Sequence, residues 1–303
     1  MVVFLTPLAH PNSVKNIRQI ERLLDITCHS LLSQTDQDFR LVVICNEIPS
    51  INFTQNSKVI FHLVKFPPLK TDRLNKIQVN DPDYKLFMRD KGVRLLSGLL
   101  FSQQFNPDYI FPLDYDDWLN INIVDHLHRS TKSPVWYVEG GYTVNFKIKE
   151  YKRRHGMLRY CGSVFAFENN FLLELANINS KTLLDAYSTK EELISATSDQ
   201  FVEDILGNHV FGYYHFSRLG LPPRPFPFRA MAWVTETGAN VSKTPGGIDG
   251  IPINSNFCKL FGLPKPLINQ TNVPIIPKIR EAIACAISKI SWLESRLKKR
   301  FIY

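Results

Sequence analysis

The acidic run DYDDWL carries the residues best suited to chemistry, Asp114, Asp116 and Asp117. It follows the apolar residues 109–113 directly, which predicts a turn at the end of a buried strand. In extended backbone, residues two apart point the same way, so Asp114 and Asp116 could converge on one cation. A divalent ion would offset the repulsion between the acids and bring phosphate oxygens to them. A solvated acidic loop is the alternative.

Strands and helices that alternate along the chain must position this run, and their order predicts an α/β core. Ligands in open α/β sheets gather at the carboxyl ends of the strands, which is where the acids would lie. Strands are expected at residues 2–5, 39–45, 58–64 and 108–113, and helices at 12–31 and 89–103.

The chain after residue 120 has a different pattern, in which extended aromatic-rich segments predict an antiparallel addition to the sheet. Prolines predict a linker over 261–277, and isoleucines that alternate with charged residues predict a basic amphipathic helix over 278–303. The extended segments are expected at 134–139, 142–148, 163–167 and 230–235, with a mostly helical stretch at 183–206.

Composition places the chain among folded soluble proteins, because 44% of its 303 residues are apolar and 21% are charged. The net charge of +8 favours an anionic partner. The five cysteines are scattered and form no CxxC pair, as is typical of a reduced compartment. Because no apolar run reaches the roughly 18 residues of a membrane span and no signal-peptide pattern starts the chain, we expect a cytoplasmic protein.

Motifs of several enzyme classes are missing from the sequence. It contains no GxxxxGKS/T loop, no GxGxxG turn after the first strand, no HExxH, no GxSxG and no zinc-spaced Cys and His set. The sequence therefore does not support a kinase, dehydrogenase, zinc-protease or α/β-hydrolase function. The basic residues are spread along the chain without a recognition-helix or RNP-like pattern, so we expect no nucleic-acid partner.

The order of the elements, ending in the strand that carries DYDDWL, resembles the GT-A glycosyltransferases, specifically the bacterial family 2-like enzymes. The resemblance covers about residues 1–245. It implies a Rossmann-related mixed sheet flanked by helices, with a catalytic domain over 1–260 that divides into a nucleotide-binding half, 1–120, and an acceptor half, 121–260. The implied activity is transfer of a sugar, with Mn²⁺ or Mg²⁺, from a nucleotide-diphosphate donor to a glycan or lipid-linked acceptor. Inversion is favoured over retention, as in a hexosyltransferase of polysaccharide biosynthesis.

The resemblance also implies roles for individual residues. Asp116 and Asp117 would hold the metal, Asp114 would meet the metal or the ribose, and His209 would be a further ligand. For His209 a packed core position is the alternative. The other nucleotide contacts would be Thr6, Pro7, Asn46, Glu47, Lys91 and Arg94, the last two of which could equally form a plain charged helix face.

A general base must take the proton of the acceptor hydroxyl as its oxygen attacks the anomeric carbon. The resemblance implies an acid near the start of a helix, and TSDQFVED offers Asp199 and Glu203. Asp199 could equally be a helix cap. Glu139 is the third catalytic candidate, near the reacting centre with Gly162. Further diphosphate or acceptor contacts are expected at Arg229, Asn240 and Ser242.

Two other functions stay open from the sequence. A nucleotidyltransferase also places acids and a metal on an α/β sheet, but LTPLAHPNS lacks the Gly-rich basic loop usual after its first strand. The other is a non-catalytic binding protein with a degenerate glycosyltransferase fold.

The predicted tail helix has two interpretations. Basic residues on one side and isoleucines with Trp292 on the other suit an interfacial helix on anionic lipid, which would make the protein peripheral at the inner face of the membrane. Packing of the same apolar stripe on the catalytic domain is the alternative.

Overall fold

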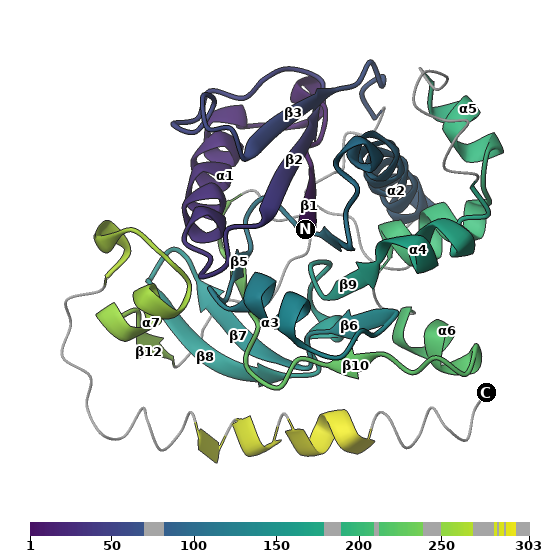
Figure 1. The fold of residues 1–303 in the computed structure, drawn as a ribbon. Coiled ribbons are helices and arrows are strands. Elements are labelled where there is room, and N and C mark those ends of the chain that lie inside the picture. The colour runs from purple at the N-terminus through teal and green to yellow at the C-terminus, as the bar shows by residue number, and fades with distance from the viewer. Residues whose placement is uncertain are drawn as a thin grey trace.

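The computed structural model describes residues 1–69, 82–178, 189–208, 212–238, 250–268, 282–283, 285–287 and 289–294. The strands in these ranges form one sheet of seven strands and one of five, with helices around both (Figure 1). The predicted class, a Rossmann-related mixed sheet flanked by helices, is confirmed.

The larger sheet has the strand order β10-β6-β9-β4-β1-β2-β3. Parallel neighbours form one side of it: β1 (Val2–Pro7), β2 (Phe39–Cys45), β3 (Val59–Leu63) and β4 (Tyr109–Pro112). β9 (Phe165–Glu168) runs antiparallel to both β4 and β6 (Val135–Tyr137), and β10 (Arg224–Pro225) is parallel to β6. The carboxyl ends of β4 and β6 therefore lie at the same edge as those of β1, β2 and β3.

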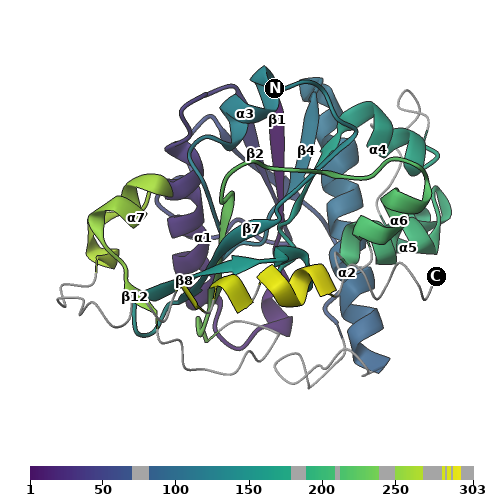
Figure 2. The same ribbon diagram turned by 90° about the horizontal axis from the view of Figure 1, so that it is seen from below.

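Burial explains why these segments fold as they do. Every residue of β1 is buried, as expected for an apolar strand in a parallel sheet covered on both faces. α1 (Ile17–Leu32) buries a helical stripe that includes Ile20, Leu24 and Leu31, and its cap is Asn16, whose Oδ1 accepts from the Gln19 N–H at 3.1 Å. α1 and α2 (Pro82–Ser102) lie on opposite sides of the larger sheet (Figure 2).

The smaller sheet has the order β12-β8-β7-β11-β5. β7 pairs antiparallel with β8 and parallel with β11. The predicted antiparallel addition to the first sheet is confirmed for residues 134–139 and 163–167, which form β6 and β9, and was wrong for 142–148, which forms β7 of the second sheet. The strands are β5 (Trp118–Leu119), β7 (Gly140–Asn145), β8 (Glu150–His155), β11 (Met231–Thr235) and β12 (Ile251–Pro252).

A second hydrophobic cluster joins the smaller sheet to α7 (Ser255–Leu260). Trp118 and Val234 meet Phe257 in it. The segment predicted as a linker begins inside this cluster, and the 3-10 helix η5 (Lys265–Leu267) closes it. Packing therefore continues past the end of α7, through Phe261, Leu263 and Leu267, all of which are buried.

Shorter helices complete the described chain. The π-helix η4 (Phe201–Gly207) packs closely on α2. A Cβ on Gly92 of α2 would lie 1.9 Å from the carbonyl oxygen of Val202 in η4. Of the helical stretch predicted at 183–206, residues 183–188 lie outside the described residues, and α5 and η4 confirm helical turns in the rest. The shorter helices are η1 (Pro11–Ser13), η2 (Gln103–Phe105), α3 (Ile123–Arg129), η3 (Met157–Arg159), α4 (Asn169–Leu175), α5 (Lys190–Ser195), η4 (Phe201–Gly207) and α6 (Gly212–Arg218).

Helical residues are also described between 282 and 294, inside the amphipathic helix predicted for 278–303. They lie along β8, below the smaller sheet in the view of Figure 1 and across it in Figure 2. Across the described ranges, no helix is both long enough and apolar enough to cross a membrane.

Candidate functional site

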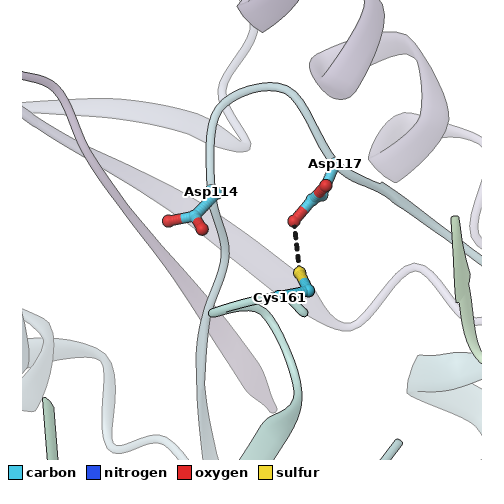
Figure 3. A group of neighbouring side chains, drawn as sticks. All are labelled: Asp114, Asp117 and Cys161. Carbon is cyan, nitrogen blue, oxygen red and sulfur yellow. Dashed lines mark hydrogen bonds between the residues drawn. The ribbon is translucent and has the colours of Figure 1, made fainter. Parts of the chain in front are cut away.

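The turn from Asp114 to Asp117 joins β4 of the larger sheet to β5 of the smaller one (Figure 3). The N–H of Asp117 donates to the carbonyl oxygen of Asp114 at 3.2 Å, which closes the turn. From α1, the hydroxyl of Thr27 donates to the carbonyl oxygen of Tyr115 at 2.8 Å. The acidic run is thus held at the carboxyl edge of the parallel strands, as the sequence predicted.

Asp117 is a buried acceptor that ties the turn to two other elements. Its Oδ2 accepts from the Ser163 hydroxyl at 2.7 Å and from the Cys161 thiol at 2.8 Å, both just before β9. Its Oδ1 accepts from the N–H of Val234 on β11 at 3.2 Å. Burial and then the charge of Asp114 raise the pKa of Asp117, and the three hydrogen bonds oppose that rise. This geometry makes Asp117 chiefly a structural residue.

Asp114 forms an ion pair with the ammonium group of Lys91 on α2. Burial alone would lower the pKa of Lys91, but the charge and hydrogen bond of Asp114 outweigh it and the pKa is raised. Gly162 lies against this pair, since a Cβ there would come within 2.6 Å of the Lys91 Nζ and 2.8 Å of an Asp114 oxygen. A side chain at residue 162 would therefore displace the ends of the Lys91 and Asp114 side chains.

Asp116 lies between these two acids and is only 8% exposed. Burial, followed by the charges of Asp117 and Asp114, raises its pKa well above the ordinary value. An ionised carboxylate in such a place is unfavourable unless a cation comes close to it. A cation near the turn would therefore favour the ionised form of Asp116.

The donor set around the turn fits a hard divalent cation. One ligand atom each from Asp114, Asp117 and Cys161 lies within 4.8 Å of the others (Figure 3). The Cys161 thiol is a poor ligand, because burial and the nearby Asp117 and Asp114 charges raise its pKa far above the usual range and keep it protonated. Carboxylate oxygens are the ligands that Mg²⁺ or Mn²⁺ prefers, and in this group Asp114 and Asp117 supply them.

The predicted nucleotide contacts lie along the same edge. Thr6 and Pro7 end β1 and are buried. Within the described ranges, the Thr6 hydroxyl has no hydrogen-bond partner, so it could serve a ligand there. Asn46 is held in place after β2, because its amide donates to the carbonyl oxygens of residues 64 and 66 at 3.0 and 2.8 Å. Glu47 is exposed beside it.

Arg94 is a buried cation rather than a residue on an open helix face. Its Nε donates to Asp90 at 2.9 Å and its Nη1 to Asn46 at 2.9 Å, while its guanidinium lies over the Phe66 ring. Lys190 reaches the same Asp90 carboxylate. Of the Arg94 guanidinium nitrogens, Nη2 has no hydrogen-bond partner within the described ranges. If Arg94 contacts a phosphate, Nη2 is therefore the atom that would donate.

The acids predicted as general bases form two separate groups. Arg89 of α2 pairs with Asp199 at 2.8 Å and with Glu203 at 2.7 Å, and Lys85 lies 3.3 Å from Glu203. Asp199 is largely exposed and Glu203 largely buried, with side-chain exposures of 63% and 11%.

Glu139 lies elsewhere, just beyond β6. Its Oε1 accepts from the Tyr137 hydroxyl and from the indole N–H of Trp292, each at 3.1 Å. The carboxylate is thus held by one neighbour in the sheet and one in the tail helix.

The structure brings five of the predicted site residues together, Lys91, Asp114, Asp116, Asp117 and Gly162. The hydrogen bonds to Asp117 were not predicted from the sequence, although Gly162, which lies between their donors Cys161 and Ser163, was expected near the reacting centre. Arg229 lies toward the tail, where its guanidinium contacts the Cys285 sulfur at 3.7 Å. The predicted contacts His209, Asn240 and Ser242 lie outside the described residues.

No family model matches the chain, and no curated protein does either. Among solved structures it resembles S. aureus TarS 1-349, with 12% identity and a TM-score of 0.37 over 77% of this chain and 60% of that one. TarS 1-349 in complex with UDP-GlcNAc gives 12% identity and a TM-score of 0.36 over 86% and 64%. A mannose-1-phosphate geranyltransferase from Thermus thermophilus gives 12% and 0.35 over 77% and 73%. The chain spans less than two thirds of these TarS structures, and at such TM-scores the matches assign it no function.

Proposed function

We propose that this chain is a metal-dependent glycosyltransferase of the GT-A type, family 2-like, that uses a nucleotide-diphosphate sugar as donor. The observation that supports this most is the buried Asp116, between Asp114 and Asp117 at the carboxyl edge of the parallel strands. A divalent cation that bridges the acids to a diphosphate would relieve their repulsion. Asp116, with its buried carboxylate, would be the main ligand and Asp114 the second.

The bound metal would stabilise the negative charge that develops on the leaving diphosphate. Lys91 forms an ion pair with Asp114 and places a positive charge next to it. The Thr6 hydroxyl at the end of β1 would donate to the nucleotide, and Asn46, held by Arg94, would border the base. These residues would bind and orient the donor without moving protons.

A carboxylate of the chain would serve as general base. The acceptor oxygen forms a bond to the anomeric carbon, the bond from that carbon to the diphosphate oxygen breaks, and the base takes the hydroxyl proton. Attack from the face opposite the leaving group inverts the anomeric centre. Asp199 is our first candidate because it is exposed, whereas Glu203 lies between two cations and Glu139 accepts two hydrogen bonds.

We further propose a glycan or lipid-linked acceptor, and a role in polysaccharide biosynthesis at the cytoplasmic face of a membrane. The net charge of +8 supports this setting, because it would attract both a phosphorylated donor and an anionic lipid carrier. A hexose is the sugar class that we would test first.

Thermal unfolding with Mn²⁺ and a panel of UDP-, GDP-, CDP- and dTDP-linked sugars tests the donor site. A donor at 100 times its Kd should add about 2.7 kcal/mol of stability. The shift should need Mn²⁺, occur with one nucleotide class and vanish in Asp116→Asn. Asp125→Asn is the matched control, because this acid pairs with Arg129 on α3, outside the candidate site.

The products then separate this proposal from its alternatives. A glycosyltransferase releases the nucleoside diphosphate when an acceptor is present. Release of pyrophosphate from a nucleoside triphosphate and a sugar phosphate would instead assign a nucleotidyltransferase. A metal-dependent shift without turnover on any acceptor tested would indicate a non-catalytic binding protein, and no shift with any donor would overturn the donor site.

A further inference from the structure

Trp292 is the buried side chain that joins the tail helix, described between residues 282 and 294, to the domain. Two weaker contacts accompany it, from Arg159 to the Ser291 hydroxyl at 3.5 Å and from Arg229 to the Cys285 sulfur at 3.7 Å. Trp292 is only 1% exposed, and its ring packs against the backbone of Gly156. A Cβ at Gly156 would lie only 2.8 Å from the nearest ring atoms. The guanidinium of Arg159 lies over the same ring at 5.4 Å, and Glu139 accepts the indole N–H. These contacts set the rotation of the helix about its own axis.

The side of this helix away from Trp292 exposes three isoleucines, Ile283, Ile287 and Ile290, with Glu294 at its C-terminal end and Leu293 at its edge. At about 100° per residue, the nine positions from Ile283 to Trp292 place the two side chains on opposite sides of the helix. The sequence had grouped Trp292 with the isoleucines, and the structure separates them. The alternative that the isoleucine stripe packs on the domain is therefore wrong. The side chains of Ile283, Ile287, Ile290 and Leu293 are between 47% and 61% exposed.

This stripe is the main cluster of exposed large apolar side chains in the described chain. Of eleven such residues, four lie on this one helix, and the other seven are spread over separate elements and loops. Single exposed apolar residues are ordinary, whereas a row of four at helical spacing marks a surface that contacts something apolar.

Charge selects the kind of partner. Residues 278–303 contain seven Lys and Arg against two Glu in the sequence. A second copy of the chain would carry the same excess of positive charge, which opposes self-association. An anionic lipid surface attracts the basic residues and accepts the isoleucines among its acyl chains.

We propose that the face formed by Ile283, Ile287, Ile290 and Leu293 binds the surface of an anionic phospholipid bilayer, with the helix parallel to the membrane. Trp292 holds the helix to the domain from the opposite side, so the domain would be carried to the membrane as one body. This inference does not depend on the glycosyltransferase proposal, because it rests on the tail and not on the acidic turn.

Sedimentation of the full chain with vesicles tests it, using equal parts phosphatidylglycerol and phosphatidylcholine against phosphatidylcholine alone. We expect binding to the anionic vesicles that weakens with salt, and at least a tenfold loss of affinity in the double variant Ile283→Asn with Ile287→Asn, which leaves the charge unchanged. The control changes two exposed leucines elsewhere, Leu86→Asn with Leu219→Asn, and should stay within twofold of the wild type. Thermal unfolding checks that all three proteins are folded.

Three results would overturn the proposal. The wild type does not bind the anionic vesicles, or the isoleucine variant binds them as well as the wild type does. The third is a dimer in analytical ultracentrifugation that the isoleucine variant dissociates, together with no vesicle binding, which would assign the face to a second copy. Should the double variant unfold, Ile287→Asn alone keeps the test open, with an expected loss of several-fold.

Discussion

The indole N–H of Trp292 donates to Oε1 of Glu139 at 3.1 Å, which joins the last described helix to the end of β6. The Tyr137 hydroxyl donates to the same oxygen, so this carboxylate is shared between the sheet and the tail. Gly156, with a φ of 66°, turns the backbone so that the ring can lie against it. A carboxylate at the edge that carries the acidic turn is thus in contact with the helix that presents the isoleucine face.

Replacing Trp292 should detach the tail helix from the domain. Removal of a buried aromatic ring typically costs about 3 to 5 kcal/mol, so Trp292→Ala should leave residues 289–294 unprotected in hydrogen exchange. Trp292→Phe keeps most of the packing and loses one hydrogen bond, at a cost of about 1 kcal/mol, and should stay protected. Equal protection in the alanine variant and the wild type would show that other contacts hold the helix.

Asp116 and Asp117 should respond in opposite ways to removal of their carboxylates. Asp117→Ala leaves the Cys161 thiol, the Ser163 hydroxyl and the Val234 N–H without their acceptor, and a loss of at least about 2 kcal/mol is expected in urea unfolding. Asp116→Asn relieves repulsion and should stay within about 1 kcal/mol of the wild type without metal. The reverse order would contradict the division of roles between the two acids.

Much of the larger sheet could be predicted because its strands are local apolar runs. The predictions for β1, β2, β3 and β4 lie within two residues of the observed bounds, since burial on both faces produces an unbroken apolar pattern. Of the smaller sheet, β7 and β11 were predicted as extended segments, but their assembly into a second sheet was not. β5 and β12 have two residues each, and β7 pairs with β11 from a distant part of the sequence.

The acidic turn was noticed from the sequence, but the different roles of its individual residues could not be predicted from it. Asp116 and Asp117 are neighbours of one type, and only partners from β9 and β11 tell them apart. Arg94 was predicted as a phosphate contact because it is basic, yet its Nε and Nη1 are occupied by Asp90 and Asn46. Contacts between residues far apart in sequence leave no local pattern to read.

Gly92 should be intolerant of any side chain. A Cβ there would stand 1.9 Å from the Val202 carbonyl oxygen, a clash with backbone that neither α2 nor η4 can avoid without moving apart. We expect Gly92→Ala to cost at least about 3 kcal/mol, above the usual range for overpacking, measured by urea unfolding. Gly140→Ala is the control: its Cβ would meet only Arg229 Cγ, at 3.6 Å, and the change should stay within about 1 kcal/mol. Similar losses in both variants would mean that the α2–η4 contact is looser than described.

Stability should fall on acidification, and His62 should account for part of the fall. Burial lowers the pKa of His62 below its ordinary value of 6.5, and its ring stacks on Phe101 with centroids 4.3 Å apart. The unfolded chain therefore binds the proton more readily than the folded one does. The stabilisation is fully present above pH 6.5 and is lost as the pH falls below it, toward the lowered pKa of the folded state.

The variant His62→Gln isolates this contribution. Glutamine can keep a hydrogen bond to Ser97, whose hydroxyl lies 2.8 Å from the histidine Nε2, but it does not titrate. Urea midpoints at pH 8 and pH 5.5 should therefore differ less in the variant than in the wild type. Part of the difference should persist, because burial also lowers the pKa of His10, His126, His155 and His215. An unchanged pH dependence would show that His62 gains protons as easily when folded as when unfolded.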